Sequence, residues 1–207
     1  MKKFIFILLA ITAVTFNSTA QDRFRVGLKA GLSTSQVEGD TYGGFHKAGA
    51  AGGIFVNAKF KEKWSAQMEI IFIQKGSKFV GDPENGDGRY YYMGLNYIEV
   101  PVLFQYHQKK FTFEIGPAFG YLISSQEFNQ DGEIYMPVPF HSTEFSGDIG
   151  VSFQLFKNLS LNWRYSNSLL PIRSFRSGQS RWYNPGQRNN VLAFTLFYQF
   201  GGNEKSE

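Results

Sequence analysis

The chain has 207 residues, no cysteine and a formal net charge of +4. This length suits a single domain, and without cysteine the fold has no disulfide framework. Removing Lys2 and Lys3 with the leader described below leaves 19 basic residues (21 less 2) against 17 acidic ones. The mature net charge of about +2 argues against a nucleic-acid partner.

The first predicted element is a secretory signal peptide over residues 1–20. Lys2 and Lys3 precede an apolar stretch over residues 4–16, and small residues follow it. The alternative is a transmembrane anchor, but a helix that spans a bilayer needs about 20 apolar residues. The sequence therefore predicts export, with a mature barrel domain over residues 21–207.

The rest of the chain is predicted to form β-strands, because apolar and polar residues alternate. Near the start, Val26 and Leu28 lie on one face and Lys29 on the other. Four apolar residues on the polar face, which either fill the interior or mark a bulge, are Ile71, Ile73, Val191 and Phe197. The eight predicted strands are Arg23–Ser33, Ala48–Phe60, Trp64–Gly76, Leu95–Tyr106, Phe111–Ser124, Glu144–Phe156, Leu159–Ser166 and Asn190–Phe200.

The connections between these strands alternate in length. Short turns are predicted at Lys61–Lys63, Gln108–Lys110 and Lys157–Asn158. Long loops are predicted at roughly Gln36–His46, Ser77–Gly94, Gln126–Thr143 and Leu169–Arg188. Short turns at one end and long loops at the other are typical of transmembrane barrels. We therefore predict an all-β protein, an eight-stranded antiparallel up-and-down transmembrane barrel with short periplasmic turns and four long extracellular loops.

A soluble barrel also alternates, but its outer face meets water and should be dense in lysine and glutamate. Here the polar face carries one or two charges per strand among small residues, which suits a crowded interior. The other face is apolar, with aromatic residues assigned to strand ends, where the membrane interfaces favour them. These aromatic residues are Trp64, Trp163, Tyr165, Tyr198 and Phe200. The apolar face is therefore predicted to contact outer-membrane lipid.

Glu99 and Pro101 lie in one predicted strand and share its polar face. A buried glutamate needs a partner, and a strand proline loses one ladder hydrogen bond, which is tolerable at a bulge or a strand end. We expect Glu99 to pair across the lumen with Lys29 or Arg164. A narrow barrel is filled by side chains, so the charged residues of the polar face predict a plug of ion pairs. Its predicted members are Lys29, Glu69, Glu99, Glu114, Asp148 and Arg164.

Four stretches together resemble the PorT-like outer-membrane β-barrel family of Gram-negative bacteria. They are VGLKAGLS from Val26, QKGSKF from Gln74, LNYIEVPVLFQY from Leu95 and FEIGPAFGYLIS from Phe113. The resemblance covers nearly the whole mature chain, and the part from Asn96 to Pro101 is the most specific. It implies an eight-stranded outer-membrane barrel, and its namesake implies a role in protein secretion.

No cofactor or metal site is predicted. The three histidines, His46, His107 and His141, lack metal-ligand spacing. A rim protease using Asp40, Asp131 and His141 has no pattern to support it. The stretch from Asp82 to Gly88 resembles part of a calcium loop, but Gly86 and Met93 replace two ligands, so a hairpin loop is the better interpretation.

The last two long loops have opposite charge. The first is acidic, with Glu127, Asp131 and Glu133, and the second is basic. The simpler interpretation is that these loops pair with each other at the rim. The other is that basic and aromatic residues contact lipopolysaccharide phosphates or a protein. The candidates for such a contact are Arg173, Arg176, Arg181, Trp182 and Arg188.

These observations favour a non-catalytic barrel that acts as an interaction or structural component of the envelope, and the PorT-like resemblance implies an accessory role in protein secretion. Its predicted partners are outer-membrane lipid, lipopolysaccharide and envelope or secretion proteins. The alternatives are a barrel enzyme acting on lipid or peptide, a small pore, and a soluble barrel that binds a hydrophobic ligand. The final strand ends on the aromatic Phe200, but seven residues follow it, unlike the terminal aromatic signal of barrel assembly.

Overall fold

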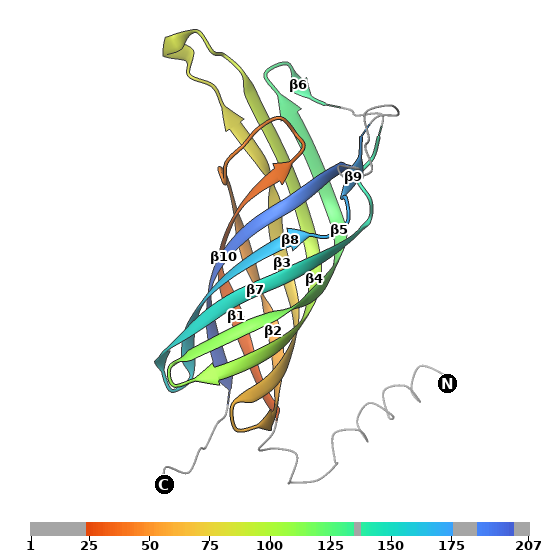
Figure 1. The fold of residues 1–207 in the computed structure, drawn as a ribbon. Coiled ribbons are helices and arrows are strands. Elements are labelled where there is room, and N and C mark those ends of the chain that lie inside the picture. The colour runs from red at the N-terminus through yellow and green to blue at the C-terminus, as the bar shows by residue number, and fades with distance from the viewer. Residues whose placement is uncertain (1–23, 135–137, 176–185, 201–207) are drawn as a thin grey trace, which may run out of the picture.

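Eight long antiparallel strands form a closed barrel in the computed structural model, which describes residues 24–134, 138–175 and 186–200. Each strand pairs with its neighbour in sequence, and the first also pairs with the last, which removes every long sheet edge. Figure 1 shows the strands wound steeply around one axis. The barrel strands are β1 (Phe24–Glu38), β2 (Lys47–Lys61), β3 (Trp64–Val80), β4 (Tyr90–Gln108), β5 (Phe111–Asn129), β7 (Thr143–Phe156), β8 (Leu159–Ser168) and β10 (Gly186–Phe200).

Two short strands and one helical turn, which the alternation pattern did not predict, lie in the long loops. β6 (Gly132–Glu133) pairs with the end of β5, and β9 (Arg173–Ser174) pairs with the start of β10. The 3₁₀ helix η2 (Pro83–Asn85) forms the tip of the β3–β4 hairpin. Pairs of two residues carry too little alternation to be recognised from sequence.

The strands extend further into the predicted long loops than expected. The loop predicted over Ser77–Gly94 is shorter, because β3 runs to Val80 and β4 begins at Tyr90, and their register is continuous up to that pair. Tyr42 stacks on Phe79 and Tyr91 here, with ring centroids 5.0 and 4.5 Å away. This aromatic packing stabilises the extended hairpin, which projects from the long-loop end in Figure 1.

The alternation of inward and outward side chains is unbroken at the four apolar residues that were predicted either to fill the interior or to mark a bulge. Ile71 and Ile73 are buried in phase with Glu69, and Val191 and Phe197 are buried in phase with Thr195. No register shift occurs at either pair of positions. These four apolar side chains therefore fill the lumen, and the bulge interpretation is wrong.

Pro101 lies mid-strand in β4, not at a bulge or a strand end as expected. On its β3 side the pairing stops at Met68 opposite Val102 and resumes at Ile71 opposite Glu99 in the same register. On its β5 side Pro101 stays paired with Ala118. The β4–β5 ladder is also interrupted just after Pro101, and resumes at Phe104 opposite Ile115 in the same register. The barrel therefore tolerates the proline without a shift on either side.

The predicted signal peptide, residues 1–20, lies outside the described residues. None of the described segments forms a helix with the length and hydropathy that crossing a membrane requires. β1 begins and β10 ends at the short-turn end of the barrel, where Val26 pairs with Phe200. The fold thus presents two different ends, one of two-residue turns and one of long loops, joined by a side-chain-filled lumen.

Candidate functional site

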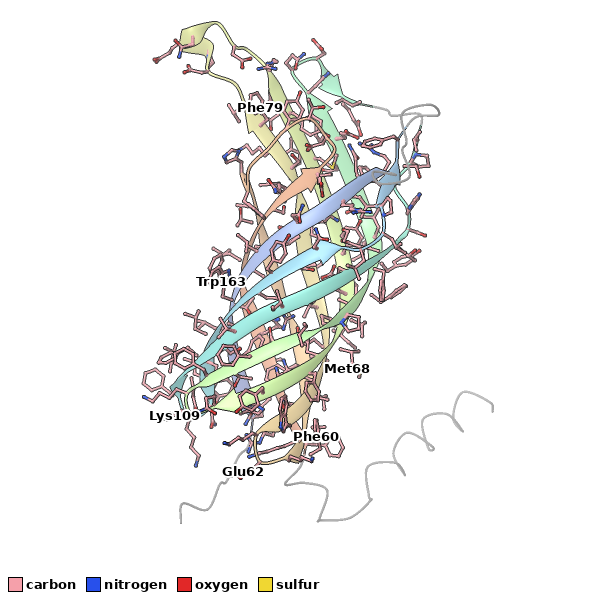
Figure 2. All side chains as sticks on the ribbon, viewed as in Figure 1. Phe60, Glu62, Met68, Phe79, Lys109 and Trp163 are labelled. Carbon is pink, nitrogen blue, oxygen red and sulfur yellow. The ribbon has the colours of Figure 1, made fainter. Side chains whose placement is uncertain are left out.

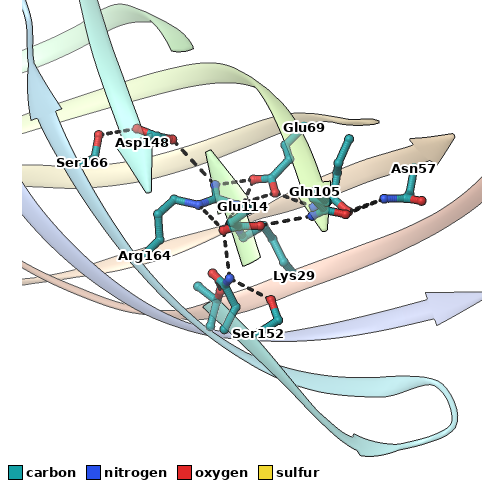
Figure 3. Close-up of polar contacts among 12 residues, drawn as sticks. Lys29, Asn57, Glu69, Gln105, Glu114, Asp148, Ser152, Arg164 and Ser166 are labelled. Atoms are coloured by element: carbon teal, nitrogen blue, oxygen red, sulfur yellow. Dashed lines mark hydrogen bonds and ion pairs between the residues drawn. The ribbon is translucent and has the colours of Figure 1, made fainter. Parts of the chain in front are cut away.

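The centre of the lumen is organised around the guanidinium group of Arg164 from β8 (Figure 3). Its two terminal nitrogens each donate to a carboxylate oxygen of Glu69 at 2.8 Å, and Nε donates to Glu114 Oε1 at 2.8 Å. Asp148 Oδ2 lies 3.9 Å from Nη1. Lys29 Nζ donates to Glu69 Oε2 at 2.8 Å. These five residues come from five strands, so the central cluster ties opposite walls together.

Amide and hydroxyl groups satisfy the remaining oxygens of the central cluster. Gln105 Nε2 donates to Glu114 Oε2 at 3.1 Å, and Asn162 Nδ2 donates to Glu114 Oε1 at 2.9 Å. Gln67 Nε2 donates to Glu69 Oε1 at 2.8 Å. On the short-turn side, Asn57 Nδ2 donates to Gln105 Oε1 at 2.7 Å. The charged cluster therefore continues into a floor of amides that faces the short-turn end.

A second cluster lies closer to the long loops and contains two residues that the sequence analysis left out. Lys75 forms ion pairs with Glu99 and, at 3.1 Å, with Glu144. Glu144 also accepts hydrogen bonds from Ser168 Oγ at 2.5 Å and Asn189 Nδ2 at 3.2 Å. All of these side chains are buried.

The expectation that Glu99 pairs with Lys29 or Arg164 is therefore wrong. Those two cations are engaged by Glu69 and Glu114 at a different height of the barrel. The signal for the true partner was present, because Lys75 shares parity with Glu69. Parity assigns a side chain to the lumen, but the height at which strands meet is set by the barrel stagger, which the sequence pattern does not specify.

Between these two clusters, a cavity of about 10 Å³ touches Glu99, Asp148 and Arg164. That volume is about what one water molecule needs. Elsewhere in this part of the lumen, apolar side chains such as Leu103 and Tyr97 are fully buried. The described lumen is thus packed through its middle.

At the long-loop end the two oppositely charged loops meet through Arg173 and Glu127. Arg173 Nη1 and Nη2 donate to the two Glu127 oxygens at 2.7 and 3.1 Å, and Arg173 Nε donates to Gln187 Oε1 at 2.8 Å. Tyr91 donates its hydroxyl hydrogen to Glu127 at 2.7 Å. Phe140 covers the guanidinium, with its centroid 4.2 Å away. This is the pairing that the loop charges suggested.

Arg173 is therefore not placed to contact lipopolysaccharide, contrary to the second interpretation of these loops. Its side chain is buried beneath Phe140 and committed to Glu127. Arg188 is half-buried at the start of β10, opposite Glu38. The other three residues proposed for that contact, Arg176, Arg181 and Trp182, lie outside the described residues.

The residues imagined for rim catalysis contact their surroundings separately, and no contact between them is seen in the described ranges. His141 Nδ1 lies 3.0 Å from the Pro171 carbonyl oxygen, and Asp40 Oδ1 accepts from the Tyr42 amide at 2.8 Å. Asp131 Oδ2 accepts from Gln130 at 3.2 Å. Burial raises the pKa of Asp40. Within the described ranges, no cluster of histidine and carboxylate residues has the arrangement to hold a metal ion.

The Asp82–Gly88 loop is a compact turn, not a calcium site. Asp82 caps η2 by accepting from the Glu84 amide at 3.1 Å, and its second oxygen accepts from Asn85 Nδ2 at 2.7 Å. Gly86 supplies the left-handed conformation after the helix, with φ 79°. Asp87 instead pairs with Arg89 at 2.8 Å, and that guanidinium lowers the pKa of Asp87 to about 2.

The outer wall of the barrel is apolar over most of its height. Trp163 and Ile149 are about half exposed, as are Met68 and Phe113 on other strands. Figure 2 shows Met68 and Trp163 pointing away from the barrel, with Phe60 close to the short turns. In water such a continuous apolar surface would be unfavourable, whereas in a bilayer it matches the lipid chains. Trp163, expected near a strand end, lies midway along β8.

The amino-acid sequence over residues 18–173 matches a family model described as "Outer membrane protein beta-barrel domain". The chain belongs to this family. The protein is therefore an integral β-barrel protein of the bacterial outer membrane, as its sequence pattern and apolar wall indicated. The family match establishes an outer-membrane barrel in general. It does not distinguish the PorT-like family from other outer-membrane barrels. No curated protein matches the sequence.

Solved outer-membrane barrels have the same architecture. The attachment invasion locus protein Ail of Yersinia pestis is 13% identical, with 86% of this chain and 99% of that chain covered and a TM-score of 0.51. Neisserial surface protein A (NspA) is 12% identical over 86% of this chain and 97% of that chain, with a TM-score of 0.49. At such low identity the likeness to Ail supports the fold alone.

Proposed function

We propose that this outer-membrane barrel is a non-catalytic interaction or structural component of the envelope, with its short turns in the periplasm and its long loops outside the cell. The observation that carries this proposal is the bridged lumen. Side chains join the walls through Arg164, through Lys75 and again through Arg173 at the rim. A barrel closed in this way acts through its two ends and its lipid-facing wall.

The finer version of this proposal is an accessory role in protein secretion. It is supported by the resemblance of the stretch from Asn96 to Pro101, and of three further stretches, to the PorT-like family. The test is the secreted proteome of a deletion strain, with a complemented strain and a periplasmic leakage control. Specific exported proteins retained in the periplasm would support the secretion role, and an unchanged profile would end it.

The closed lumen has its own test. Purified protein reconstituted in planar bilayers should give no steady conductance. A wild-type channel with stable conductance would overturn the closed-lumen argument and favour a small pore.

The non-catalytic assignment has a separate test. Exchanging His46 and His141 for alanine should leave lipid A composition and peptide cleavage unchanged, and a loss of either activity would overturn the assignment.

A further inference from the structure

The short-turn end of the barrel is strongly basic. Its turns between barrel strands are tight, and each of the three carries lysine at or beside its centre. Figure 2 shows Lys109 and Glu62 at this end. Among the described residues of these turns and of the strand ends beside them, Glu62 is the single acidic one. The basic residues described there are Arg25, Lys59, Lys61, Lys63, Lys109, Lys110 and Lys157.

Part of this charge surrounds a cavity of about 260 Å³ in the mouth of the barrel. Lys109, Lys110 and Lys157 line it, together with Arg25, Lys59 and the acidic Glu62. Lys61 and Lys63 belong to the same end but are not among the lining residues. The basic residues of this end therefore divide into a set that faces the cavity and a set that does not.

The floor of the cavity is polar and uncharged. It is formed by the amide side chains of Asn57, Gln67 and Gln105, which also hydrogen-bond to one another or to the central cluster. Directly above them, the central cluster sets the cations Lys29 and Arg164 against the carboxylates of Glu69, Glu114 and Asp148. Its formal charge of −1 (two cations less three carboxylates) is smaller than the positive charge of the residues that line the mouth, and low-dielectric walls focus the remaining positive potential.

Lys109 also occupies an unfavourable backbone position. It has φ 55°, in the left-handed region where tight hairpin turns usually use glycine or asparagine. A lysine there costs backbone strain that asparagine would reduce. The turn therefore places a positive charge beside the cavity at a local cost to stability.

The composition of this mouth indicates the class of ligand. Lysine ammonium groups pair with carboxylates and with phosphates alike, so the amide groups of the floor decide the class of ligand. Amides can donate to and accept from a peptide backbone at the same time. Lysine charges around an amide floor are thus suited to carboxylates carried on a peptide.

We propose that the short-turn mouth of the barrel is a docking site for an acidic peptide segment of a periplasmic protein. Lys109, Lys110 and Lys157 would pair with its carboxylates, while the amides of the floor would hydrogen-bond to its backbone. This inference rests on the proposed function, because it requires that the short turns face the periplasm and that the barrel acts through its ends.

The test uses the full-length protein in nanodiscs of zwitterionic lipid, so that no lipid anion competes for the site. Fluorescence anisotropy measures binding of labelled hexaglutamate, with hexaglutamine as the neutral probe and inorganic phosphate as the competitor. The variant Lys109→Gln/Lys110→Gln removes two charges from the cavity. The matched control Lys61→Gln/Lys63→Gln removes two charges from the same end outside the cavity.

Hexaglutamate should bind the wild type in a salt-dependent manner and hexaglutamine should not. The cavity variant should lose about tenfold in affinity and the control variant about twofold or less. Equal losses in the two variants would overturn the site, since only the general charge of this end would then matter. No hexaglutamate binding, or competition by phosphate at the same charge concentration, would overturn the acidic-peptide assignment.

A second experiment, in intact cells, distinguishes failure of the docking site from failure of the proposed interaction role. Mild cross-linking of intact cells reports whether the barrel has envelope partners at all. Cross-links that persist in the cavity variant overturn the periplasmic docking site and leave the interaction role standing. Absence of any cross-link in the wild type overturns the interaction role, whereas hexaglutamate binding by the purified protein can still be measured.

Discussion

The centre of the lumen and its long-loop rim use the same chemistry in two settings. Arg164 meets Glu69 and Glu114 where the barrel wall surrounds the cluster on all sides. Arg173 meets Glu127 beside an open cavity of about 530 Å³. Water can replace a lost partner at the rim but not at the centre. The contribution of an ion pair therefore depends on what remains when one member is removed.

The largest effect is expected from Arg164→Met. This change leaves the carboxylates of Glu69 and Glu114 buried without their main partner, and should lower the free energy of unfolding by about 3–5 kcal/mol. Urea unfolding in lipid vesicles, followed by tryptophan fluorescence, measures it. Adding Glu114→Gln to the same chain should restore part of the loss, because it neutralises the carboxylate left without a cation while Glu69 keeps its pair with Lys29. A double variant as unstable as the single one would show that packing, not unpaired charge, is responsible.

Lys75→Met should have the next largest effect. Glu144 keeps its hydrogen bonds from Ser168 and Asn189, so chiefly Glu99 is left without a partner. We expect a loss near 3 kcal/mol, about the lower bound for a broken buried pair. The same unfolding measurement applies, with Lys75→Met/Glu99→Gln as the matched variant. If that second change gives no recovery, Glu99 is not the residue that Lys75 neutralises.

Arg173→Met tests the rim. The Glu127 carboxylate retains the Tyr91 hydroxyl and adjoins the rim cavity, so the loss should be about 2 kcal/mol, in the range for a hydrogen bond to a charged group. A loss equal to that of Arg164→Met would contradict the difference between the two settings. Limited proteolysis of the β5–β7 loop should accelerate in this variant but not in Lys75→Met.

The smallest effect is expected at the exposed pair of Asp87 and Arg89. Arg89→Gln should leave stability at neutral pH unchanged within error, because exposed ion pairs contribute little. The pKa of Asp87 is lowered to about 2, below its ordinary value. Any contribution of the pair is thus present above about pH 4 and is lost as the pH falls through about 2. Carboxylate chemical shifts should give a midpoint near 2 in the wild type and a higher midpoint in Arg89→Gln, which loses the side-chain contact but keeps the backbone amide that also donates to Asp87. Equal midpoints would rule out the pairing.

Several features could be predicted from the sequence because they depend on local pattern. Alternation placed Lys29, Glu69 and Arg164 on the inner face, where the structure has them. It placed Val26 and Leu28 on the outer face, also correctly. Opposite charges in two adjacent loops suggested the pairing now seen between Arg173 and Glu127. Each of these inferences needs only the period of a strand or the proximity of neighbouring loops.

Other features required the assembled barrel. The partner of Glu99 was misassigned, because parity cannot tell at which height two lumen residues meet. Pro101 was expected at a bulge or a strand end, although it lies mid-strand and the flanking ladder holds one register through it. β6 and β9 were missed, because their two-residue pairings arise only where longer strands already hold the loops.

The amino-acid sequence by itself determined which side chains face lipid and which face the lumen, because a strand exposes alternate residues whatever its neighbours are. It also determined that one end would be short and basic and the other long, because turn length and charge are local properties. Only the tertiary structure decided which lumen charges pair and which lysines line the mouth. Those choices depend on strand stagger and closure, which come from all eight barrel strands together.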